Sequence, residues 1–305
     1  MTCYLRPMKI VISGSSGLVG RWLVPDLEAA GHQVVRLVRG EIRPGPPGVA
    51  TWDPMRGELD SAVLSGADAV INLNGRSIGD SRWSARVKEE LRSSRIRSTE
   101  TLARAMTTAA SPPPLLISAS AVGYYGDRGE EVLDEGSPPG TGFLADLARD
   151  WERAALAAAS GRTRVVLLRL AMVVGRGGAL ERMLLPFKLG AGGPIGSGRQ
   201  WWPWIAIEDV LGVIRFLLEQ PAADGPLNLV SPHQVRCADF SKALGRVLNR
   251  PSVLPLPAPV ARLMMGEMAD ALLLASARVR PAALEGLGYA FRVPDLEAAI
   301  RHAID

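Results

Sequence analysis

The chain has 305 residues, of which 47% are hydrophobic and 22% are charged, as is typical of a water-soluble globular protein. The formal net charge is only +4 and no run of five like charges occurs, which argues against a nucleic-acid-binding or membrane-surface role. No stretch of eighteen apolar residues occurs, and the only two cysteines lie far apart, so we predict no membrane span, metal site or disulfide framework. We therefore expect a cytoplasmic protein.

The first part of the chain alternates strand-like apolar runs with helical patterns. Strands are predicted at residues 9–13, 33–38, 49–52, 69–73, 115–118 and 165–170. Helices are predicted at 17–30, 81–110 and 142–159, the first of them closed by a glycine. This alternation predicts a Rossmann-like, doubly wound parallel sheet with helices on both faces.

The pattern changes after about residue 175. Glycine and proline become dense over 190–198, three tryptophans follow within four residues, and the chain from Cys237 onward is mostly helical in pattern. We predict an NADP-binding Rossmann-like domain at 8–175, with later strands around 204–230 returning to its sheet. Residues 176–305 are predicted to form a smaller, mostly helical C-terminal lobe that carries the substrate side of the site and a C-terminal helical domain.

A glycine-rich turn follows the first predicted strand and opens the first predicted helix. Gly14 allows a tight turn, Gly17 leaves room for a pyrophosphate, and Gly20 lets helix and strand pack closely. The start of a helix also offers unpaired N–H groups and the positive end of its dipole to an anion. The turn therefore predicts a dinucleotide site formed by Gly14, Ser15, Ser16, Gly17, Leu18 and Val19.

The second predicted strand distinguishes NADP from NAD. NAD sites usually carry Asp or Glu about 20 residues after the glycine turn, whereas this strand has no acid before Glu41. A carboxylate would repel a ribose 2′-phosphate, but arginine can bind it with two hydrogen bonds. Arg39 is the first candidate for this role and Arg36 the second, so the predicted cofactor is NADP(H). The alternative is that both are solvated surface arginines.

Several motifs together resemble the extended short-chain dehydrogenase/reductase superfamily. Within it, the chain is similar over essentially its whole length to an NAD(P)-dependent epimerase/dehydratase-like subfamily with a short C-terminal helical domain of unknown role. The motifs are Gly14-x-x-Gly17-x-x-Gly20, ADAVINLNG at 67–75, Ser94-Arg95-Ile96-x-x-Thr99, SASAVGYYG at 118–126 and GSGRQW at 196–201. The resemblance implies that Leu73, Asn74, Gly75 and Ser118 lie against the cofactor. It also suggests a homodimer built through helices of the sheet domain.

The resemblance implies a catalytic group that this chain lacks. The superfamily places a Tyr-x-x-x-Lys pair on the helix after the fifth predicted strand, where the lysine helps the tyrosine to release its proton. Phe143 and Leu147 stand at these two places, and neither side chain can carry a proton. The usual mechanism is therefore not available from this helix.

Three other residues are candidates for catalysis. The resemblance places Ser120 beside the nicotinamide, where its hydroxyl would hold a substrate oxygen; the alternative is a strand-end hydroxyl tied to backbone. Tyr124 and Tyr125 lie close to it in sequence, and Arg128 follows Tyr124 by four residues, so a tyrosine activated by arginine is one solution. The alternative is that both tyrosines belong to a packed aromatic turn.

The tryptophan-rich segment is the predicted substrate side. Nucleotide-sugar relatives often carry an arginine before the strand near 204, and here Trp202 stands at that place with Arg199 nearby. We predict substrate contacts from Arg199, Trp201 and Trp202, with packing between the lobes as the alternative. Asp209 is predicted to cap the helix that follows it.

These observations predict an NADP-dependent oxidoreductase or epimerase-like enzyme that acts on a small carbonyl or alcohol substrate. The alternative is a catalytically weakened NADP-binding sensor or partner-regulating protein.

Overall fold

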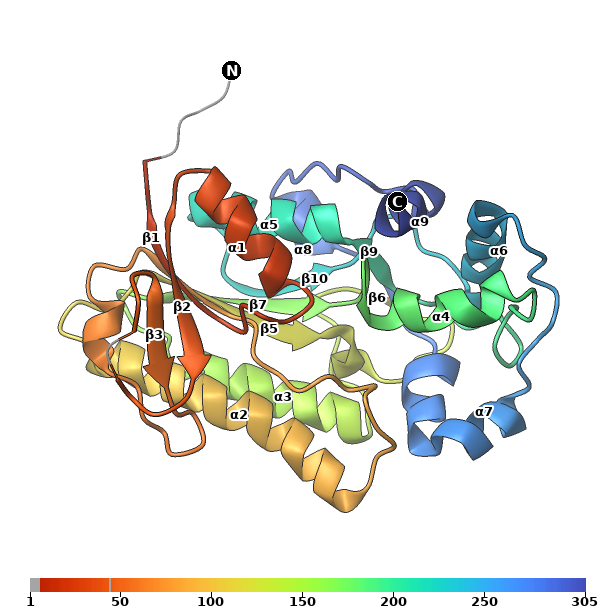
Figure 1. Ribbon diagram of the computed structural model, residues 1–305, viewed down its shortest axis with the longest axis horizontal. Coiled ribbons are helices and arrows are strands. Elements are labelled where there is room, and N and C mark those ends of the chain that lie inside the picture. Colours follow the sequence, from red (N-terminus) through yellow and green to blue (C-terminus); the bar gives the residue numbers. More distant parts are fainter. Residues whose placement is uncertain (1–5, 44) are drawn as a thin grey trace.

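A seven-stranded, all-parallel sheet forms the centre of the computed structural model, which describes residues 6–43 and 45–305 (Figure 1). The strand order is β10-β7-β5-β4-β1-β2-β3, so the direction of winding reverses between β1 and β4. Ligands of open parallel sheets bind in the crevice at such a reversal, beyond the carboxyl ends of the strands. The strands are β1 (Lys9–Ser13), β2 (Gln33–Arg39), β3 (Val49–Trp52), β4 (Ala69–Asn72), β5 (Leu115–Ala121), β7 (Arg164–Leu170) and β10 (Gly225–Leu229).

Helices cover both faces of the sheet (Figure 1). On one face lie α1 (Gly20–Ala29) and α5 (Ile207–Glu219), and on the other lie α2 (Ala85–Thr108) and α3 (Phe143–Leu156). Ile10 and Ile12 belong to the core of the first face and Val11 to the core of the second, and all three are fully buried. A strand buried on both faces has no polar alternation, which explains the apolar run in the sequence. The predicted Rossmann-like sheet is confirmed.

The later strands are arranged differently from the expectation. Only β10 joins the main sheet, whereas β9 (Trp204–Ala206) pairs with β8 (Met172–Val174) in a separate two-stranded sheet. Ala171 alone separates β8 from β7, so β8 offers β9 a free edge beyond the main sheet. A second small sheet pairs β6 (Val132–Leu133) with β11 (Arg278–Val279) and so joins two distant parts of the chain. Short helices η1 (Ser61–Leu64) and η2 (Val122–Tyr125) follow β3 and β5.

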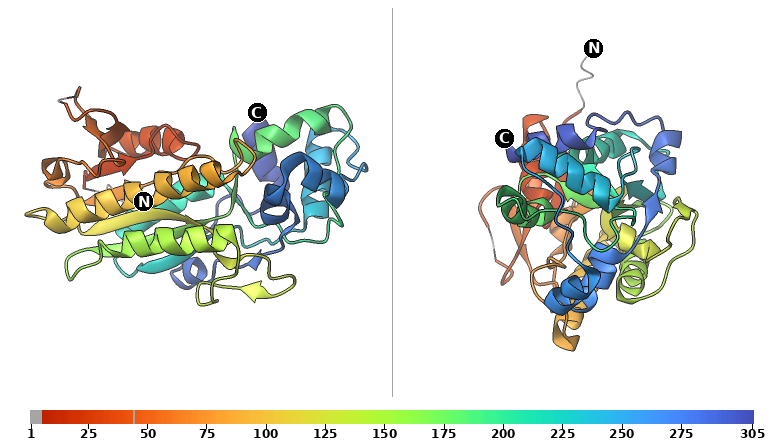
Figure 2. Two further views of the ribbon diagram at one scale, coloured as in Figure 1. Left: turned by 90° about the horizontal axis from the view of Figure 1, so that it is seen from below. Right: turned by 90° about the vertical axis from the view of Figure 1, so that its right-hand side faces the viewer.

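The C-terminal lobe is mostly helical and lies at one end of the sheet domain (Figures 1 and 2). Trp202, Trp204, Phe187, Phe240 and Ile300 are buried together in a core of its own. One part of the lobe returns to the sheet, because Leu284 is fully buried in the core beneath α1 and α5. Its helices are α4 (Gly178–Lys188), α6 (Cys237–Leu248), α7 (Ala258–Met265), the π-helix η3 (Ala269–Leu274), α8 (Ala282–Gly286) and α9 (Leu296–Ile304).

Asp209 fastens the C-terminal segment to α5. Its carboxylate is buried and accepts hydrogen bonds from the backbone N–H groups of Arg292 (2.7 Å) and Val293 (3.0 Å) and from the Tyr289 hydroxyl (3.2 Å). The helix itself is preceded by Ala206, which supplies no side-chain cap. The predicted capping role of Asp209 is wrong, because this residue lies inside α5 and its carboxylate binds the backbone of the segment at 292–293.

Across the described ranges, no helix is long and apolar enough to cross a membrane. The same residues contain no group of three or more His, Cys, Asp and Glu side chains arranged to hold a metal ion.

Candidate functional site

The glycine turn lies at the carboxyl end of β1, directly against the exit of β4. Gly14 has a φ of +79°, and a Cβ at this position would lie 2.5 Å from the carbonyl oxygen of Leu73. A Cβ at Gly20 would overlap the carbonyl oxygen of Gly14. Glycine is therefore required at both positions, at Gly14 by backbone conformation and contact and at Gly20 by contact alone.

The same turn presents unpaired donors to the crevice. The backbone N–H groups of Ser15, Ser16 and Leu18 form no hydrogen bond with any backbone group that the structure describes. Ser16 and Gly17 are also exposed. Because α1 begins at Gly20, these amides stand at the positive end of its dipole, where an anion is stabilised. The turn therefore fits a pyrophosphate.

Arg36 and Arg39 lie on the neighbouring strand β2, with Arg39 as its last residue. Both side chains are exposed, and neither guanidinium forms an ion pair with a carboxylate of the described ranges. Arg39 is thus a free cation at the carboxyl end of the strand beside the glycine turn, where it can bind a phosphate, whereas Arg36 lies in the middle of β2 on its opposite face.

Asn72 organises the polar groups at the ends of β1, β4 and β5. Its amide nitrogen donates to Oγ1 of Thr99 (2.8 Å) and to Oγ of Ser118 (3.1 Å). Its amide oxygen accepts from Oγ of Ser13 (3.0 Å) and from Nδ2 of Asn74 (3.0 Å). Ser118 is fully buried within this network, whereas Asn74 is partly exposed at its edge. Asn72 was not among the predicted site residues, although an amide at the end of an apolar strand is a recognisable signal.

Arg95 holds the loop that follows β4. Its guanidinium donates to the carbonyl oxygens of Leu91 (3.1 Å) and Arg76 (2.9 Å), and its Cζ lies 5.1 Å from the centre of the Trp151 ring. A Cβ at Gly75 would lie 3.1 Å from the same Cζ. Burial lowers the pKa of Arg95 to about 10. The predicted cofactor wall at 73–75 is thus fixed from behind by a buried arginine.

Ser120 belongs to a buried ion pair. Its hydroxyl is 2% exposed and donates to Oε1 of Glu152 (2.6 Å). The guanidinium of Arg169 donates to both oxygens of the same carboxylate (2.8 and 2.9 Å). Burial lowers the pKa of Arg169, but the hydrogen bonds and charge of Glu152 outweigh burial and raise the pKa overall. Because the Ser120 proton is already donated to Glu152, this hydroxyl can offer an incoming ligand only its lone pairs.

The two tyrosines after β5 have different surroundings. Tyr125 is fully buried, donates to Oδ1 of Asn228 (2.7 Å) and accepts from Nη1 of Arg169 (2.9 Å). Burial raises the pKa of Tyr125 to about 12, so its hydroxyl holds its proton firmly. Tyr124 is partly exposed, and its hydroxyl forms no hydrogen bond with the described part of the chain. Of the two, Tyr124 is the one a ligand can reach.

The cation beside these tyrosines is not the predicted one. Arg128 pairs with Glu131 (2.6 Å), so its predicted role as the partner of Tyr124 is wrong. Instead, Cζ of Arg169 lies 3.6 Å from the centre of the Tyr124 ring. The spacing of four residues placed Arg128 on the same side as Tyr124 only if the segment were helical, and η2 ends at Tyr125.

The first turn of α3 is apolar, as the sequence indicates. Phe143 is the first residue of α3 and packs edge-on against Trp83, with ring centres 5.1 Å apart. Leu147 is 2% exposed and packs with Val87 and Leu91 of α2. The two positions where a tyrosine and a lysine are expected therefore form part of a small hydrophobic cluster.

The predicted substrate residues are brought close together but are packed. Trp202 is 7% exposed and donates to the carbonyl oxygen of Leu273 (3.1 Å), and Arg199 is exposed nearby. Trp201 lies between the guanidinium groups of Arg236 (4.3 Å) and Arg278 (4.6 Å). The cavity beside these tryptophans has a volume of about 10 Å³, which is enough for one water molecule. In this conformation the tryptophans leave no room for a substrate.

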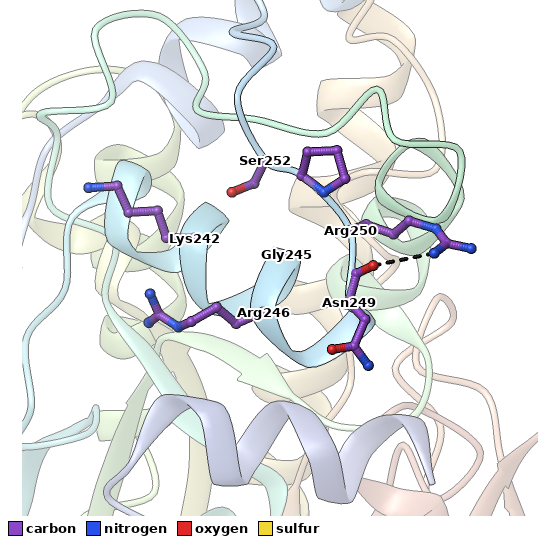
Figure 3. Close-up of a pocket in the computed structure, with 7 residues that line it drawn as sticks. Lys242, Gly245, Arg246, Asn249, Arg250 and Ser252 are labelled. Carbon is purple, nitrogen blue, oxygen red and sulfur yellow. Dashed lines mark hydrogen bonds between the residues drawn. The ribbon is translucent and has the colours of Figure 1, made fainter.

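A larger, open cavity of about 420 Å³ lies at the end of α6 (Figure 3). Arg246 in its wall is already paired with Glu297, and Arg250 donates to the carbonyl oxygens of Lys188 and Asn249. The cavity contains none of the predicted site residues. Its lining is Lys242, Gly245, Arg246, Asn249, Arg250, Pro251 and Ser252.

Comparison with protein families identifies two matching regions. Residues 10–230 match the NAD dependent epimerase/dehydratase family. Residues 256–303, which contain α7 to α9, match a domain of unknown function (DUF1731).

Similar proteins occur in bacteria and animals. Epimerase family protein MT2273 of Mycobacterium tuberculosis is 43% identical over 295 residues, which cover 96% of this chain and 97% of that protein. Human epimerase family protein SDR39U1 is 38% identical over 301 residues, covering 97% of this chain and 100% of that protein.

Two solved structures share the fold at comparable identity. The structure of human SDR39U1 (isoform 2) with NADPH has a TM-score of 0.88 and 36% identity, covering 97% of this chain and 99% of that one. A nucleoside-diphosphate sugar epimerase from Corynebacterium glutamicum has a TM-score of 0.80 and 37% identity, covering 98% of this chain and 58% of that one.

Proposed function

This chain belongs to the NAD-dependent epimerase/dehydratase family, and we propose that it is an NADP(H)-dependent oxidoreductase or epimerase-like enzyme for a small carbonyl or alcohol substrate. The observation that carries the proposal is the glycine turn with its unpaired amides, next to Arg39 at the end of β2. The human relative solved with NADPH supports the choice of cofactor.

The residues at the crevice match the parts of such a cofactor. The amides of the glycine turn would hold the pyrophosphate, and Arg39 would bind the ribose 2′-phosphate. Leu73, Asn74 and Gly75 would line the wall opposite, on the loop that Arg95 fixes. The nicotinamide, when bound, supplies or accepts hydride.

Substrate would meet the carboxyl end of β5. Tyr124 is the accessible phenol there, and its ring is held against the Arg169 guanidinium. Ser120 can accept a hydrogen bond from a substrate hydroxyl while it donates to Glu152. The packed tryptophans Trp201 and Trp202, with Arg199, would contact substrate only after the segments of the lobe around them have moved apart.

Cofactor preference tests the proposal directly. We expect NADPH to bind more tightly than NADH when both are titrated by tryptophan fluorescence. Arg39→Gln should weaken NADPH binding by about 10- to 100-fold, the value of a charge-assisted hydrogen-bonded contact of about 1.5–3 kcal/mol, and leave NADH binding unchanged. Arg162→Gln is the matched control, because Arg162 is an exposed arginine in the turn before β7, which three strands separate from β2. Equal affinities for NADPH and NADH would overturn the assignment of Arg39.

A second pair of variants tests the turn itself. Gly17→Asp puts a carboxylate among the amides and should abolish binding of both cofactors. Gly161→Asp is the control, since Gly161 is also exposed and a Cβ there meets no atom. Retention of cofactor binding by Gly17→Asp would exclude the turn as the site. Once cofactor binding is confirmed, reduction of a panel of aldehydes and ketones, followed at the nicotinamide absorbance, would identify the substrate.

Two observations favour a second candidate, a weakened NADP-binding sensor or regulator of a partner. The positions for the tyrosine and lysine are filled by Phe143 and Leu147, and the Ser120 proton is bound to Glu152. If NADPH binds tightly but no carbonyl compound is reduced, this function replaces the first.

The proposal also includes a homodimer through helices of the sheet domain and a cytoplasmic location. Light scattering of the purified protein tests the first, and fractionation of cells that express it tests the second.

A further inference from the structure

Lys88 reaches across the first turn of α3 from the neighbouring helix α2. Its Nζ lies 5.1 Å from the centre of the Phe143 ring, and its side chain is 31% exposed. The other face of this small cluster is closed by Trp83, whose indole donates to the carbonyl oxygen of Ile78 (3.0 Å). The Lys88 ammonium group therefore lies over the apolar surface that Phe143 and Trp83 form at the start of α3.

This place is at the ligand-binding edge of the sheet. The helix η2 leaves the carboxyl end of β5, and the start of α3 packs close to it, because a Cβ at Gly123 of η2 would lie only 3.2 Å from Cβ of Leu144. Trp83 and Ile78 belong to the segment that leaves β4. Since β1 and β4 flank the point where the strand order reverses, the segment that leaves β4 borders the crevice where such sheets bind ligands. The start of α3 packs against this segment through the contact of Phe143 with Trp83.

The choice of lysine at this position is chemically specific. Lysine occurs only four times in the sequence, as Lys9, Lys88, Lys188 and Lys242, whereas arginine accounts for 31 of the 35 basic residues. Arginine supplies charge but cannot release a proton in a protein, and lysine can do both. A chain that uses arginine for almost all of its positive charge has a lysine beside Phe143.

Two of the other proton carriers near this edge are engaged, whereas the Tyr124 hydroxyl has no hydrogen bond within the described residues. The Ser120 hydroxyl donates to Glu152, and Tyr125 is fully buried with its hydroxyl donating to Asn228. Tyr124 remains partly exposed, with its ring stacked on Arg169. Among the residues that the structure describes, the one hydrogen-bonding partner of Lys88 is Glu267 of the lobe (2.5 Å). The Glu267 side chain is 51% exposed, so this pair is solvated and can open.

We propose that Lys88 is a catalytic residue that protonates the substrate oxygen, in place of the tyrosine that position 143 lacks. The inference rests on the proposed function. When hydride adds to a carbonyl carbon, the C=O electron pair moves to the oxygen, and the proton that completes the alcohol comes from Nζ. Lys88 is left neutral and regains a proton from water. In the reverse direction neutral Lys88 accepts the proton of the alcohol.

Nuclear magnetic resonance of the lysines tests the position of Lys88 without turnover. Reductive ¹³C-methylation labels the amines and keeps their charge, and four lysines give a spectrum that Lys→Arg variants can assign. The Lys88 signal should shift with NADP⁺ and stay unchanged with adenosine 2′,5′-bisphosphate, which has no nicotinamide. The Lys9, Lys188 and Lys242 signals should ignore both. A Lys88 signal that responds to neither ligand, or equally to both, overturns the inference.

Steady-state kinetics on a carbonyl compound reduced by the wild type test the role. Lys88→Met and Lys88→Arg should each lower kcat by about 10²- to 10⁴-fold, the usual contribution of a general acid, with NADPH affinity unchanged. Lys188→Met should have no effect. Glu267→Gln removes the same ion pair but keeps the amine, and should retain kcat within a few-fold.

Failure of the proposed role of Lys88 and failure of the proposed function give different results in these experiments. Wild-type kcat in Lys88→Arg, or a loss in Glu267→Gln equal to that in Lys88→Met, would mean that charge or the interlobe contact suffices, and the inference fails. Absence of NADPH binding in the wild type would instead remove the proposed function.

Discussion

Arg169 joins three elements at the carboxyl end of the sheet. From β7 it forms two hydrogen bonds with Glu152 of α3, a third with Tyr125 of η2, and a stacking contact with Tyr124. Both members of the ion pair are buried, with side chains 4% and 8% exposed. Removing either Arg169 or Glu152 should lower the free energy of unfolding, because the remaining buried charge would have no partner.

Glu152→Ala should therefore lower the free energy of unfolding by about 3–5 kcal/mol, measured by urea denaturation. Glu297→Ala is the control, because Glu297 pairs with Arg246 at the surface and such pairs contribute less than about 1 kcal/mol. If the two variants lose the same stability, the buried pair does not have the role assigned to it.

Tyr125 should make stability depend on alkaline pH. Its pKa is about 12 in the folded protein and about 10 in the unfolded chain, so between pH 10 and 12 only the unfolded state loses the proton. Stability that is fully present below pH 10 is then lost as the pH approaches 12, by about 2–3 kcal/mol.

Tyr125→Phe has no such proton to lose. The variant should be less stable than the wild type at neutral pH, because it lacks the hydrogen bonds to Asn228 and Arg169. The gap should narrow between pH 10 and 12 in urea denaturation at each pH. Parallel stability curves for the two proteins would show that the phenol is not held neutral by burial.

Individual residues were predictable where backbone geometry dictates the residue type. Gly14 and Gly20 follow from close contacts that any dinucleotide turn of this kind makes. Arg169 was missed, although an arginine inside the apolar run of β7 is a visible signal. Its partners come from 17 and 44 positions away, so the sequence does not reveal whether that arginine is paired or free.

At the scale of elements, the docking of the C-terminal segment depends on one carboxylate. Asp209 accepts hydrogen bonds from the backbone N–H groups of Arg292 and Val293, for which the described part of the chain offers no other acceptor, and from the Tyr289 hydroxyl. Burial raises the pKa of Tyr289, with the charge of Asp209 acting in the same direction.

Asp209→Ala should thus lower the free energy of unfolding by about 2–4 kcal/mol, since one buried and one partly buried backbone donor lose their acceptor. It should also speed amide exchange over 289–293. Asp295→Ala is the matched control: Asp295 is exposed and caps α9 through Ala298, a contact of about 1 kcal/mol. Unchanged exchange over 289–293 in Asp209→Ala would argue against the docking role.

Helices were easier to predict than strand pairing. The segment predicted at 81–110 contains α2, which begins later because Ser84 caps it by accepting from the N–H of Val87 (3.2 Å). The pairing of β9 with β8 has no local signal, because it depends on where Ala171 takes the chain after β7. A helix cap can be predicted from a few neighbouring residues, whereas the pairing of a short strand depends on the whole fold.

At the scale of the molecule, the sheet domain and the lobe are joined at several separate places. Lys88 pairs with Glu267, Arg182 of α4 pairs with Asp80, and β6 pairs with β11. The core beneath α1 and α5 also contains Leu284 of α8. The lobe cannot detach without exposing part of the sheet core.

We therefore expect the whole chain to unfold in one cooperative transition. In hydrogen exchange followed by mass spectrometry, peptides from β4 and from α6 should lose protection at the same urea concentration, because unfolding of the lobe removes Leu284 from the sheet core and breaks the pairing of β6 with β11. Loss of protection in α6 at clearly lower urea would instead reveal an independently folding lobe.

The contact between Gly14 and Leu73 also limits how this protein can be recombined with its relatives. The glycine turn and the exit of β4 are 59 positions apart in sequence, yet no space remains between them for a Cβ. A chimaera that takes one of these segments from a homologue and keeps the other combines two backbone segments from different proteins at this close contact. If both segments are taken from the same homologue, their backbone contact is preserved. The two segments, rather than the glycine motif alone, should therefore be exchanged together.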